Sequence, residues 1–241
     1  MSAALNVARD VGVVIVAGGS STRTGGTGTD GKTELKQFRW VAGKPALLHS
    51  LQTFMARADV VSVVVVLPRA YAGDPPPWIF QCDVDRLMVS TGGRTRTESV
   101  ANGIDDLPDE AQIVLIHDAA RPLVGDATID RVVASVRAGN CTIAALPVVD
   151  TLKEVDESGR VVRTVDRERL WRAQTPQGFP RDAIVRAHRE AKARRLTATD
   201  DAALCEALGI PITVVRGSER AMKITGEEDF ARAEAMFTLS E

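Results

Sequence analysis

Apolar runs of strand length alternate with helical patterns along most of the chain. Val11–Ala17, Val60–Leu67, Ile113–Ile116 and Cys141–Val148 are nearly unbroken apolar stretches rich in β-branched residues, which is typical of strands buried on both faces. Between them lie segments with apolar residues at helical spacing, most clearly over residues 46–58. This alternation predicts an α/β fold with a mostly parallel sheet and helices on both of its faces.

The pattern changes beyond the fourth of these runs, where the residues become more polar. Thr151–Val155 and Arg160–Val165 are short runs with β-branched residues, and they flank Asp156-Glu157-Ser158-Gly159, which favours a tight turn. Two polar strands are marginally stable in water by themselves, so we expect this hairpin to find support on a second subunit. The sequence thus predicts one domain over residues 1–241, with a projecting β-arm inserted at about 149–168.

Composition and charge narrow the classes of function. The 241 residues carry a formal net charge of −2, which gives no electrostatic basis for binding nucleic acid. No apolar run approaches the ~20 residues that a membrane-spanning helix requires, and residues 1–10 lack the apolar core of a signal peptide. Cys82, Cys141 and Cys205 are widely spaced, as expected for free thiols in a reducing compartment. We therefore expect a cytoplasmic protein that binds neither nucleic acid nor membranes.

A glycine- and hydroxyl-rich segment directly follows the first apolar run. It reads Gly18-Gly19-Ser20-Ser21-Thr22-Arg23-Thr24-Gly25-Gly26, and Lys36 lies a short distance beyond it. Open α/β sheets bind ligands at the carboxyl ends of their strands, and glycine lets backbone N–H groups approach phosphate oxygens closely. Because Arg23 and Lys36 add positive charge, we expect this segment to bind a polyphosphate.

Part of the same segment fits a second phosphate-binding pattern. Residues Gly26-Thr27-Gly28-Thr29-Asp30-Gly31-Lys32-Thr33 match the P-loop, which would make the protein an NTPase. A P-loop stands between a strand and a helix, whereas the first apolar run ends well before Gly26 and the stretch after Thr33 is soon stopped by Gly43. The context therefore favours a glycine- and threonine-rich loop, with the P-loop NTPase as the more distant alternative.

Four further motifs lie near the ends of predicted elements. They are Gly92-Gly93 through Ser99-Val100, His117–Pro122, Thr175-Pro176-Gln177 and Lys223-Ile224-Thr225. Each alone has a structural explanation, such as a helix start with a solvated basic face, a strand end or a turn. Their order behind Ala17–Arg23, however, resembles that of the 2-C-methyl-D-erythritol 4-phosphate cytidylyltransferase family over nearly the whole chain. The resemblance implies a Rossmann-like nucleotidyltransferase sheet whose β-arm is exchanged across a homodimer.

The reaction that the resemblance implies is transfer of CMP from CTP to 2-C-methyl-D-erythritol 4-phosphate, in the non-mevalonate synthesis of isoprenoid precursors. A phosphate oxygen of the acceptor attacks the α-phosphorus of CTP, and pyrophosphate leaves. Such chemistry needs alignment and neutralisation of charge more than acid–base assistance. Gly18 stands where the family usually has alanine. The Ala-Gly-Gly form is seen in the sister ribitol 5-phosphate cytidylyltransferase family, so ribitol 5-phosphate is the alternative acceptor.

Positions that match the family's motifs imply roles for individual residues. Arg23 and Lys36 would stabilise the transition state, and Lys223 would help to place the acceptor. Arg167 would grip the acceptor phosphate from the partner's arm. Asp118 would hold Mg²⁺, or another divalent cation, together with the substrate phosphates. The residues implied to bind the nucleotide or the acceptor are Ala17, Gly18, Gly19, Gly93, Ser99, Ala119, Arg121, Thr151 and Thr175.

Overall fold

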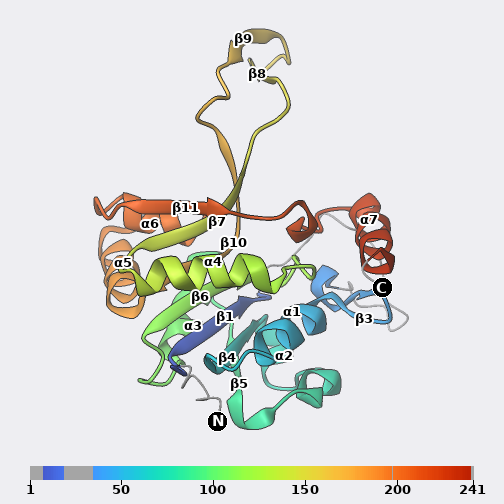
Figure 1. Cartoon of the computed structure of the whole chain (residues 1–241), viewed down its shortest axis with the longest axis vertical. Coiled ribbons are helices and arrows are strands. Elements are labelled where there is room, and N and C mark those ends of the chain that lie inside the picture. Colours follow the sequence, from blue (N-terminus) through green and yellow to red (C-terminus); the bar gives the residue numbers. More distant parts are fainter. Residues whose placement is uncertain (1–7, 19–34, 197, 240–241) are drawn as a thin grey trace, which may run out of the picture.

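The computed structural model describes residues 8–18, 35–196 and 198–239 of the chain. Its centre is a seven-stranded sheet in the order β11-β7-β10-β6-β1-β4-β5 (Figure 1). Within this sheet β10 runs antiparallel to β6 and β7, and the other neighbouring strands are parallel, which confirms the mostly parallel sheet. The strands are β1 (Val11–Val16), β4 (Val60–Leu67), β5 (Leu87–Thr91), β6 (Ile113–Asp118), β7 (Cys141–Pro147), β10 (Trp171–Pro180) and β11 (Ile212–Arg216).

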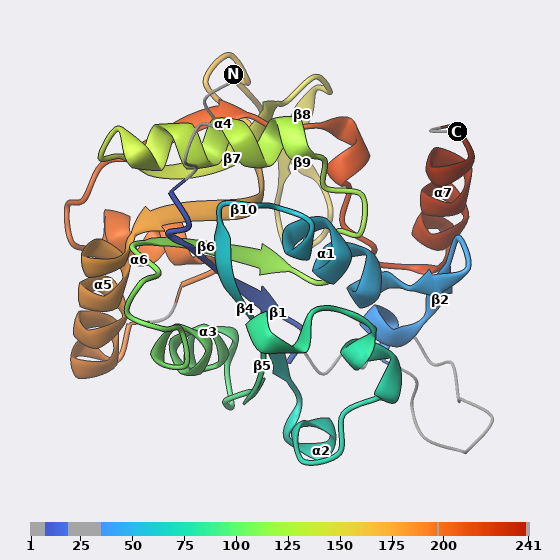
Figure 2. The ribbon, with the colours of Figure 1, turned by 60° about the horizontal axis from the view of Figure 1, so that its bottom comes forward.

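Helices cover both faces of the sheet, as the alternating pattern predicts (Figure 2). One face carries α1 (Ala46–Met55) and α4 (Asp126–Arg137), whose apolar side chains join one core cluster. The other face carries α3 (Arg96–Asp105), α5 (Arg181–Arg194) and α6 (Asp201–Glu206), which contribute to a second cluster. The sheet is therefore the middle layer of three.

The central strand β1 contributes to both clusters. Val13 and Ile15 pack on the side of α1 and α4, whereas Val14 packs on the side of α3 and α5. This division follows from the alternation of side chains along a strand. All three side chains are completely buried, and burial of an aliphatic side chain of this size stabilises a fold by roughly 1.5–3 kcal/mol.

A glycine brings α3 close to the central strand. A Cβ added to Gly103 would lie 2.5 Å from Cγ1 of Val14 and 2.7 Å from Cγ2 of Val66. Since real Cβ atoms do not approach other atoms so closely, α3 can lie at this distance from β1 and β4 because residue 103 has no side chain. The close packing places the start of α3 beside the carboxyl end of β1, where a Cβ on Gly18 would lie 3.2 Å from Oγ of Ser99.

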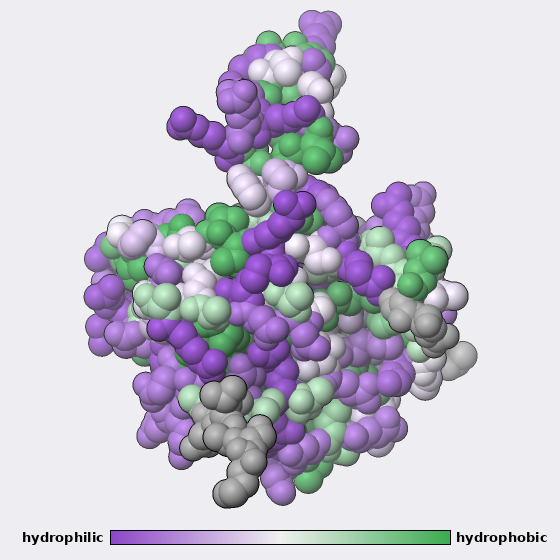
Figure 3. Space-filling model, viewed as in Figure 1, coloured by the Kyte–Doolittle hydropathy of each residue, from purple (hydrophilic) through white to green (hydrophobic). Residues whose placement is uncertain are grey.

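The predicted hairpin is present as β8 (Leu152–Val155) and β9 (Val161–Val165), which pair antiparallel and stand well away from the sheet (Figure 1). Its turn is closed by Asp156, whose Oδ1 accepts hydrogen bonds from the backbone N–H groups of Ser158 and Arg160, both at 2.9 Å. Apolar and polar residues are mixed over the surface of this arm (Figure 3). The arm valines that are more than half exposed are Val155, Val161 and Val162.

The C-terminal helix α7 (Glu227–Thr238) packs beside a small hairpin near the start of the chain. Phe230 and Ala233 of α7 share an apolar cluster with Val41, and Glu227 forms an ion pair with Arg39 at 2.6 Å. Among the described residues, every helix is too short or too polar to cross a membrane. The remaining elements are β2 (Trp40–Val41), β3 (Lys44–Pro45), α2 (Arg69–Ala72) and the 3₁₀ turns Lys36–Phe38, Pro77–Gln81, Val84–Arg86 and Glu219–Ala221.

Candidate functional site

A cleft of about 1190 Å³ lies at the carboxyl ends of β1, β4, β5 and β6. This edge is where open α/β sheets hold their ligands. The cleft is lined by the end of β1, the turn between β5 and α3, the end of β6 and two separate lysine-bearing segments. The predicted site residues among its lining are Ala17, Gly18, Lys36, Gly93, Ser99, Asp118, Ala119 and Lys223.

The backbone at the end of β1 is held from both sides. The N–H of Ala17 donates to the carbonyl of Val66 at 2.9 Å, and the N–H of Ala119 donates to the carbonyl of Val16 at 3.2 Å. The carbonyl of Ala17 accepts from the buried side chain of Gln37. The strand end is therefore rigid up to Gly18, while Gly19 and Arg23 lie outside the described residues.

The second glycine turn is closed by its own helix. Oγ of Ser99 accepts from the N–H of Gly93 at 3.0 Å and donates to the carbonyl of Thr95 at 2.8 Å. Thr95 caps α3, because its Oγ1 accepts from the N–H of Glu98 at 3.0 Å. A Cβ on Gly93 would lie 2.3 Å from Cβ of Glu98, so the turn needs glycine at this position.

Asp118 ends β6, and its carboxylate lies between two cations. Nζ of Lys223 is 2.7 Å from Oδ2, and Nη2 of Arg96 is 3.3 Å from Oδ1. Burial of Asp118 by itself raises its pKa, but Arg96 and then Lys223 outweigh this and hold the pKa well below its usual range. The carboxylate therefore stays ionised at neutral pH.

His117 is buried beside Asp118 but is engaged on both ring nitrogens. Oγ1 of Thr175 accepts from the N–H of Asp118 at 3.1 Å, so its hydroxyl donates to Nδ1 of His117 at 3.0 Å. Nε2 then donates to the carbonyl of Arg121 at 3.2 Å. Burial lowers the pKa of His117 to about 4, although Asp118 opposes this shift. A neutral imidazole with both nitrogens bonded has a structural role and is not a candidate base.

Arg121 and Thr175 lie next to the cleft without lining it. Nη1 of Arg121 donates to the carbonyl of Ala221 at 2.7 Å, while its buried Nε has no partner among the described residues. Burial lowers the pKa of Arg121, and Asp118 partly opposes this effect. The bond to Ala221 connects the end of β6 to the segment that carries Lys223. Arg121 and Thr175 therefore support the wall of the cleft without lining it.

Lys36 reaches the same region from the other side of the cleft. Its ammonium group donates to the carbonyl of Thr225. The N–H and hydroxyl of Thr225 donate to Oδ2 of Asp229 at 2.7 and 2.6 Å, and Asp229 lies in the first turn of α7. The α7 helix therefore supports the position of a lysine that comes from the start of the chain.

Thr151 and Arg167 lie just before β8 and just after β9 of the arm, and neither lines the cleft of its own chain. The guanidinium of Arg167 donates to the carbonyl of Val149 at the base of the arm. The structure of one chain thus separates these two residues from the other predicted site residues. The segment Gly26–Thr33 of the P-loop alternative lies outside the described residues.

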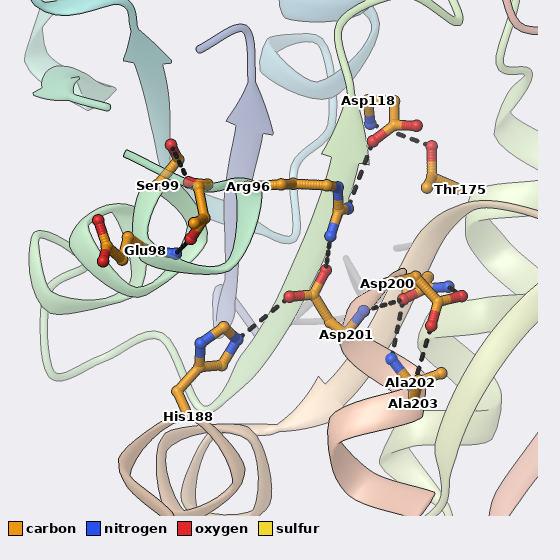
Figure 4. A network of polar contacts seen from close by, with 12 residues as sticks. Arg96, Glu98, Ser99, Asp118, Thr175, His188, Asp200, Asp201, Ala202 and Ala203 are labelled. Carbon is orange, nitrogen blue, oxygen red and sulfur yellow. Dashed lines mark hydrogen bonds and ion pairs between the residues drawn. The ribbon is translucent and has the colours of Figure 1, made fainter. Parts of the chain in front are cut away.

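Two charged residues behind the cleft were not predicted from the sequence. The guanidinium of Arg96 lies 2.6 Å from Oδ2 of Asp201, which is almost completely buried (Figure 4). Burial lowers the pKa of Arg96, but Asp201 and Asp118 outweigh it and raise that pKa. Arg94 two residues earlier is 90% exposed, so the expected solvated basic face holds for Arg94 and is wrong for Arg96. The sequence did contain a signal for this ion pair. The helix dipole disfavours a cation at the start of a helix, so a carboxylate partner for Arg96 is expected.

The acidic residues of the cleft fit a cation that arrives with a phosphate ligand. Among the described residues, no group of three or more His, Cys, Asp or Glu could hold a metal ion by itself. Mg²⁺ commonly binds one or two carboxylates and completes its shell with substrate phosphates and water. Asp118, an ionised carboxylate at the cleft edge, matches that requirement.

Comparison with known proteins gives one family. The family model for 2-C-methyl-D-erythritol 4-phosphate cytidylyltransferase matches residues 11–239. The relative of that name from Pelotomaculum thermopropionicum is 39% identical over 233 residues, which cover 94% of this chain and 93% of the relative. The crystal structure of the protein of that name from Thermus thermophilus has a TM-score of 0.78 and 33% identity, and the match covers 94% of this chain and 98% of that one.

Some relatives are longer. The bifunctional enzyme IspD/IspF of Desulfotalea psychrophila is 37% identical over 224 residues, which cover 92% of this chain and 55% of that enzyme. This chain therefore spans about half the length of the bifunctional relatives that it matches. The match in sequence and the match in fold agree with the motif order noted above. The chain belongs to the 2-C-methyl-D-erythritol 4-phosphate cytidylyltransferase family.

Proposed function

We propose that this chain transfers CMP from CTP to 2-C-methyl-D-erythritol 4-phosphate and releases pyrophosphate, a step in the synthesis of isoprenoid precursors. One observation carries the proposal: in a member of this family, two glycine turns, the ionised carboxylate of Asp118 and two lysines line a single cleft at the carboxyl edge of the sheet. These groups can bind the base and the triphosphate of one nucleotide together.

The glycine turns are the proposed nucleotide-binding surface. Gly18 and Gly93 line the cleft, and because they have no side chains their backbone lies close against Ser99 and Glu98 at the start of α3. A flat base in a narrow pocket can be recognised by the donors and acceptors of such a surface. Ala17 and Ala119, at the ends of neighbouring strands, complete this part of the proposed site.

The proposed reaction is a direct displacement at phosphorus. An oxygen of the acceptor phosphate forms a bond to the α-phosphorus of CTP, the bond from that phosphorus to the bridging oxygen breaks, and pyrophosphate carries away the electron pair. The attacking oxygen is already anionic, so no base is required. Lys36 and Lys223, with Arg23, would neutralise the charge that gathers on the phosphates.

Asp118 is the proposed ligand of Mg²⁺ or another divalent cation, which supplies further positive charge to the phosphates when bound. Lys223 pairs with Asp118 in the ligand-free protein. When phosphates and a cation enter the cleft, the ammonium group of Lys223 can exchange the carboxylate for an acceptor oxygen. The pair therefore keeps both charges oriented toward the cleft before substrates bind.

The arm is the proposed dimer contact, and Thr151 and Arg167 are proposed to hold the acceptor phosphate in the partner's cleft. Two facts support this: neither residue lines the cleft of its own chain, and the arm valines are exposed. The planar guanidinium of Arg167 suits two phosphate oxygens at once.

A cytoplasmic location belongs to the same proposal and is supported by free thiols at Cys82, Cys141 and Cys205.

A pyrophosphate-release assay tests the proposed reaction. The protein is incubated with Mg²⁺ and CTP, and with 2-C-methyl-D-erythritol 4-phosphate or ribitol 5-phosphate as the acceptor. We expect pyrophosphate and the cytidine diphosphate ester of the erythritol compound to form together, with ribitol 5-phosphate a much poorer acceptor. Faster turnover of ribitol 5-phosphate would reassign the acceptor, and nucleotide hydrolysis without any acceptor would support the P-loop alternative instead.

A further inference from the structure

A row of ionisable side chains runs from the cleft into the interior of the protein. It begins at Lys223, which pairs with Asp118. From Asp118 it passes through Arg96 to Asp201, where His188 ends it (Figure 4). The four contacts measure 2.7, 3.3, 2.6 and 3.1 Å in that order. The five residues come from five different parts of the fold, so tertiary structure alone assembles the row.

Asp201 is the most tightly held member of the row. Its side chain is 1% exposed, and its Oδ1 accepts a hydrogen bond from Nε2 of His188 on α5. Its own N–H and that of Ala202 both donate to Oε1 of Gln177, a residue of β10, at 3.2 and 3.1 Å. Gln177 of β10 thus fixes the backbone of Asp201, and His188 of α5 fixes its Oδ1. The other carboxylate oxygen, Oδ2, is directed at Arg96.

Arg96 depends on this carboxylate for its position. It is the first residue of α3, where the helix dipole disfavours a cation, and its guanidinium lines the cleft. The contact with Asp201 is 0.7 Å shorter than the contact with Asp118, from 2.6 against 3.3 Å. Asp201 therefore holds the guanidinium more closely than Asp118 does.

The charges of Asp201, Arg96 and Asp118 determine how strongly the cleft attracts a cation. Asp201 neutralises Arg96, so the negative charge of Asp118 stays available to Lys223 or to a divalent cation. Without the charge of Asp201, Arg96 would neutralise Asp118 in its place, and the attraction of Asp118 for a cation would fall. Asp201 itself does not line the cleft.

We infer that Asp201 is a positioning residue, which through Arg96 keeps the carboxylate of Asp118 oriented and free to hold the cation that accompanies the nucleotide. The inference rests on the proposed function of the cleft and adds a residue to it. Groups that orient a metal-binding carboxylate from behind typically change metal affinity or activity by roughly 10–100-fold when they are removed.

The test compares Asp201→Asn with Asp83→Asn. Asparagine at 201 keeps the size and one acceptor but loses the charge that faces Arg96. Asp83 also pairs with an arginine, Arg86, at 2.6 Å, caps the 3₁₀ turn Val84–Arg86 through the N–H of Asp85, and does not line the cleft. Asparagine is a good cap, so Asp83→Asn is a matched control for the same chemical change away from the cleft.

Two measurements give the expected result. In calorimetry with CTP and Mg²⁺ and no acceptor, Asp201→Asn should weaken nucleotide binding about tenfold, the lower end of the usual range, whereas Asp83→Asn should bind as the unchanged protein does. In the pyrophosphate assay, Asp201→Asn should need a higher Mg²⁺ concentration for half-maximal rate and should recover most of its kcat at saturating Mg²⁺. A loss of kcat that no Mg²⁺ concentration restores, or equal effects of the two variants, would overturn the inference.

A double variant tests whether Asp201 acts through Arg96. In an Arg96→Gln background there is no cation for Asp201 to neutralise, so adding Asp201→Asn should leave nucleotide binding nearly unchanged. A second tenfold loss in that background would refute the inference. The double variant has no buried charge at either position, which keeps the comparison possible if Asp201→Asn alone folds poorly.

The outcomes also separate this inference from the proposed reaction. Turnover by the unchanged protein together with normal Mg²⁺ dependence of Asp201→Asn would refute the role of Asp201 and leave the reaction standing. No turnover with either acceptor, together with weakened nucleotide binding by Asp201→Asn, would refute the reaction and support the role of Asp201 in the nucleotide site.

Discussion

The ammonium group of Lys223 lies 2.7 Å from Oδ2 of Asp118, although 105 residues separate the two along the chain. Lys223 comes from the segment before α7, and Asp118 ends β6 in the middle of the sheet. The contact ties the C-terminal part of the chain to the edge where the cleft opens. It also places one positive and one negative charge side by side at the cleft. Phosphates and a divalent cation that bind there would separate these two charges.

Removing the charge of Lys36 should abolish most of the activity. We expect Lys36→Ala to lower kcat for pyrophosphate release by about 100-fold or more, the usual loss when one group that stabilises developing charge is deleted. The control is Lys32→Ala, which removes a lysine of the P-loop alternative and should keep near-normal activity. The opposite ranking of the two variants would restore the P-loop interpretation.

Removing the guanidinium of Arg167 should affect the acceptor more than the nucleotide. We expect Arg167→Ala to raise the KM for 2-C-methyl-D-erythritol 4-phosphate by about tenfold, the loss of roughly one charged hydrogen bond of ~1.5 kcal/mol. The KM for CTP should change little. Arg163→Ala is the control, since Arg163 is also on the arm but pairs with Glu154 at 2.6 Å. A selective loss of CTP affinity would contradict the assignment.

Mixed dimers test whether the arm serves the partner's site. Chains with Arg167→Ala and chains with Lys36→Ala are each expected to be poorly active alone. If Arg167 acts across the dimer, a mixed dimer contains one cleft with both defects and one cleft with none, so co-expression should recover activity. If native mass spectrometry detects mixed dimers that remain as inactive as their parents, Arg167 does not act in the partner's cleft.

We expect Asp229 to contribute to the stability of the protein and, through Thr225, to the position of Lys36. Hydrogen bonds from the hydroxyl and N–H of Thr225 hold the pKa of Asp229 below its usual value. Its stabilising effect is thus complete above the ordinary aspartate pKa of about 3.9 and is lost as the pH falls through the lower folded-state pKa. We expect Asp229→Asn to cost about 1 kcal/mol at pH 7, because hydrogen bonds to a charged acceptor are stronger than those to a neutral one, and to flatten the acid limb of urea-unfolding stability against pH.

The same variant has a catalytic readout. Asp229 holds Thr225, whose carbonyl receives the ammonium group of Lys36. We expect Asp229→Asn to lower kcat moderately with little change in the KM for CTP. The control is Glu228→Gln, which neutralises the neighbouring acidic residue of the same helix turn. An unchanged acid limb in Asp229→Asn would contradict the role given to this carboxylate.

Gly103→Ala should destabilise the protein even though alanine favours helices. The added Cβ would lie 2.5 Å from Cγ1 of Val14, so α3 would have to move away from β1. Overpacking of a core typically costs about 1–3 kcal/mol, which exceeds the gain in helix propensity of about 1 kcal/mol. Chemical denaturation measures the difference. Gly73→Ala, where an added Cβ meets nothing within 4 Å and the backbone is in the right-handed helical region, should change stability little, and equal effects would contradict the packing argument.

The fold class and most element positions could be predicted from the sequence, because strands buried on both faces need unbroken apolar runs. β1 and β4 begin where the apolar runs begin. The antiparallel strand β10 could not be predicted in the same way. Its residues Gln174, Thr175 and Gln177 are buried and polar, and their local sequence favours a turn. They lie within a buried strand because tertiary partners satisfy their hydrogen bonds, at Ser218, His117 and Asp200.

The sequence by itself determined which chemistry the chain carries: glycine turns at strand ends, and Lys36, Asp118 and Lys223 in a recognisable order. Only the tertiary structure decided which charged side chains form ion pairs with one another. Arg96, which local sequence would place in solvent, is held by Asp201, 105 residues further along. Periodicity and motifs report on neighbours within an element, whereas ion pairs between elements depend on the order of strands in the sheet. That order places α3, α5 and α6 on one face and makes the row behind Asp118 possible.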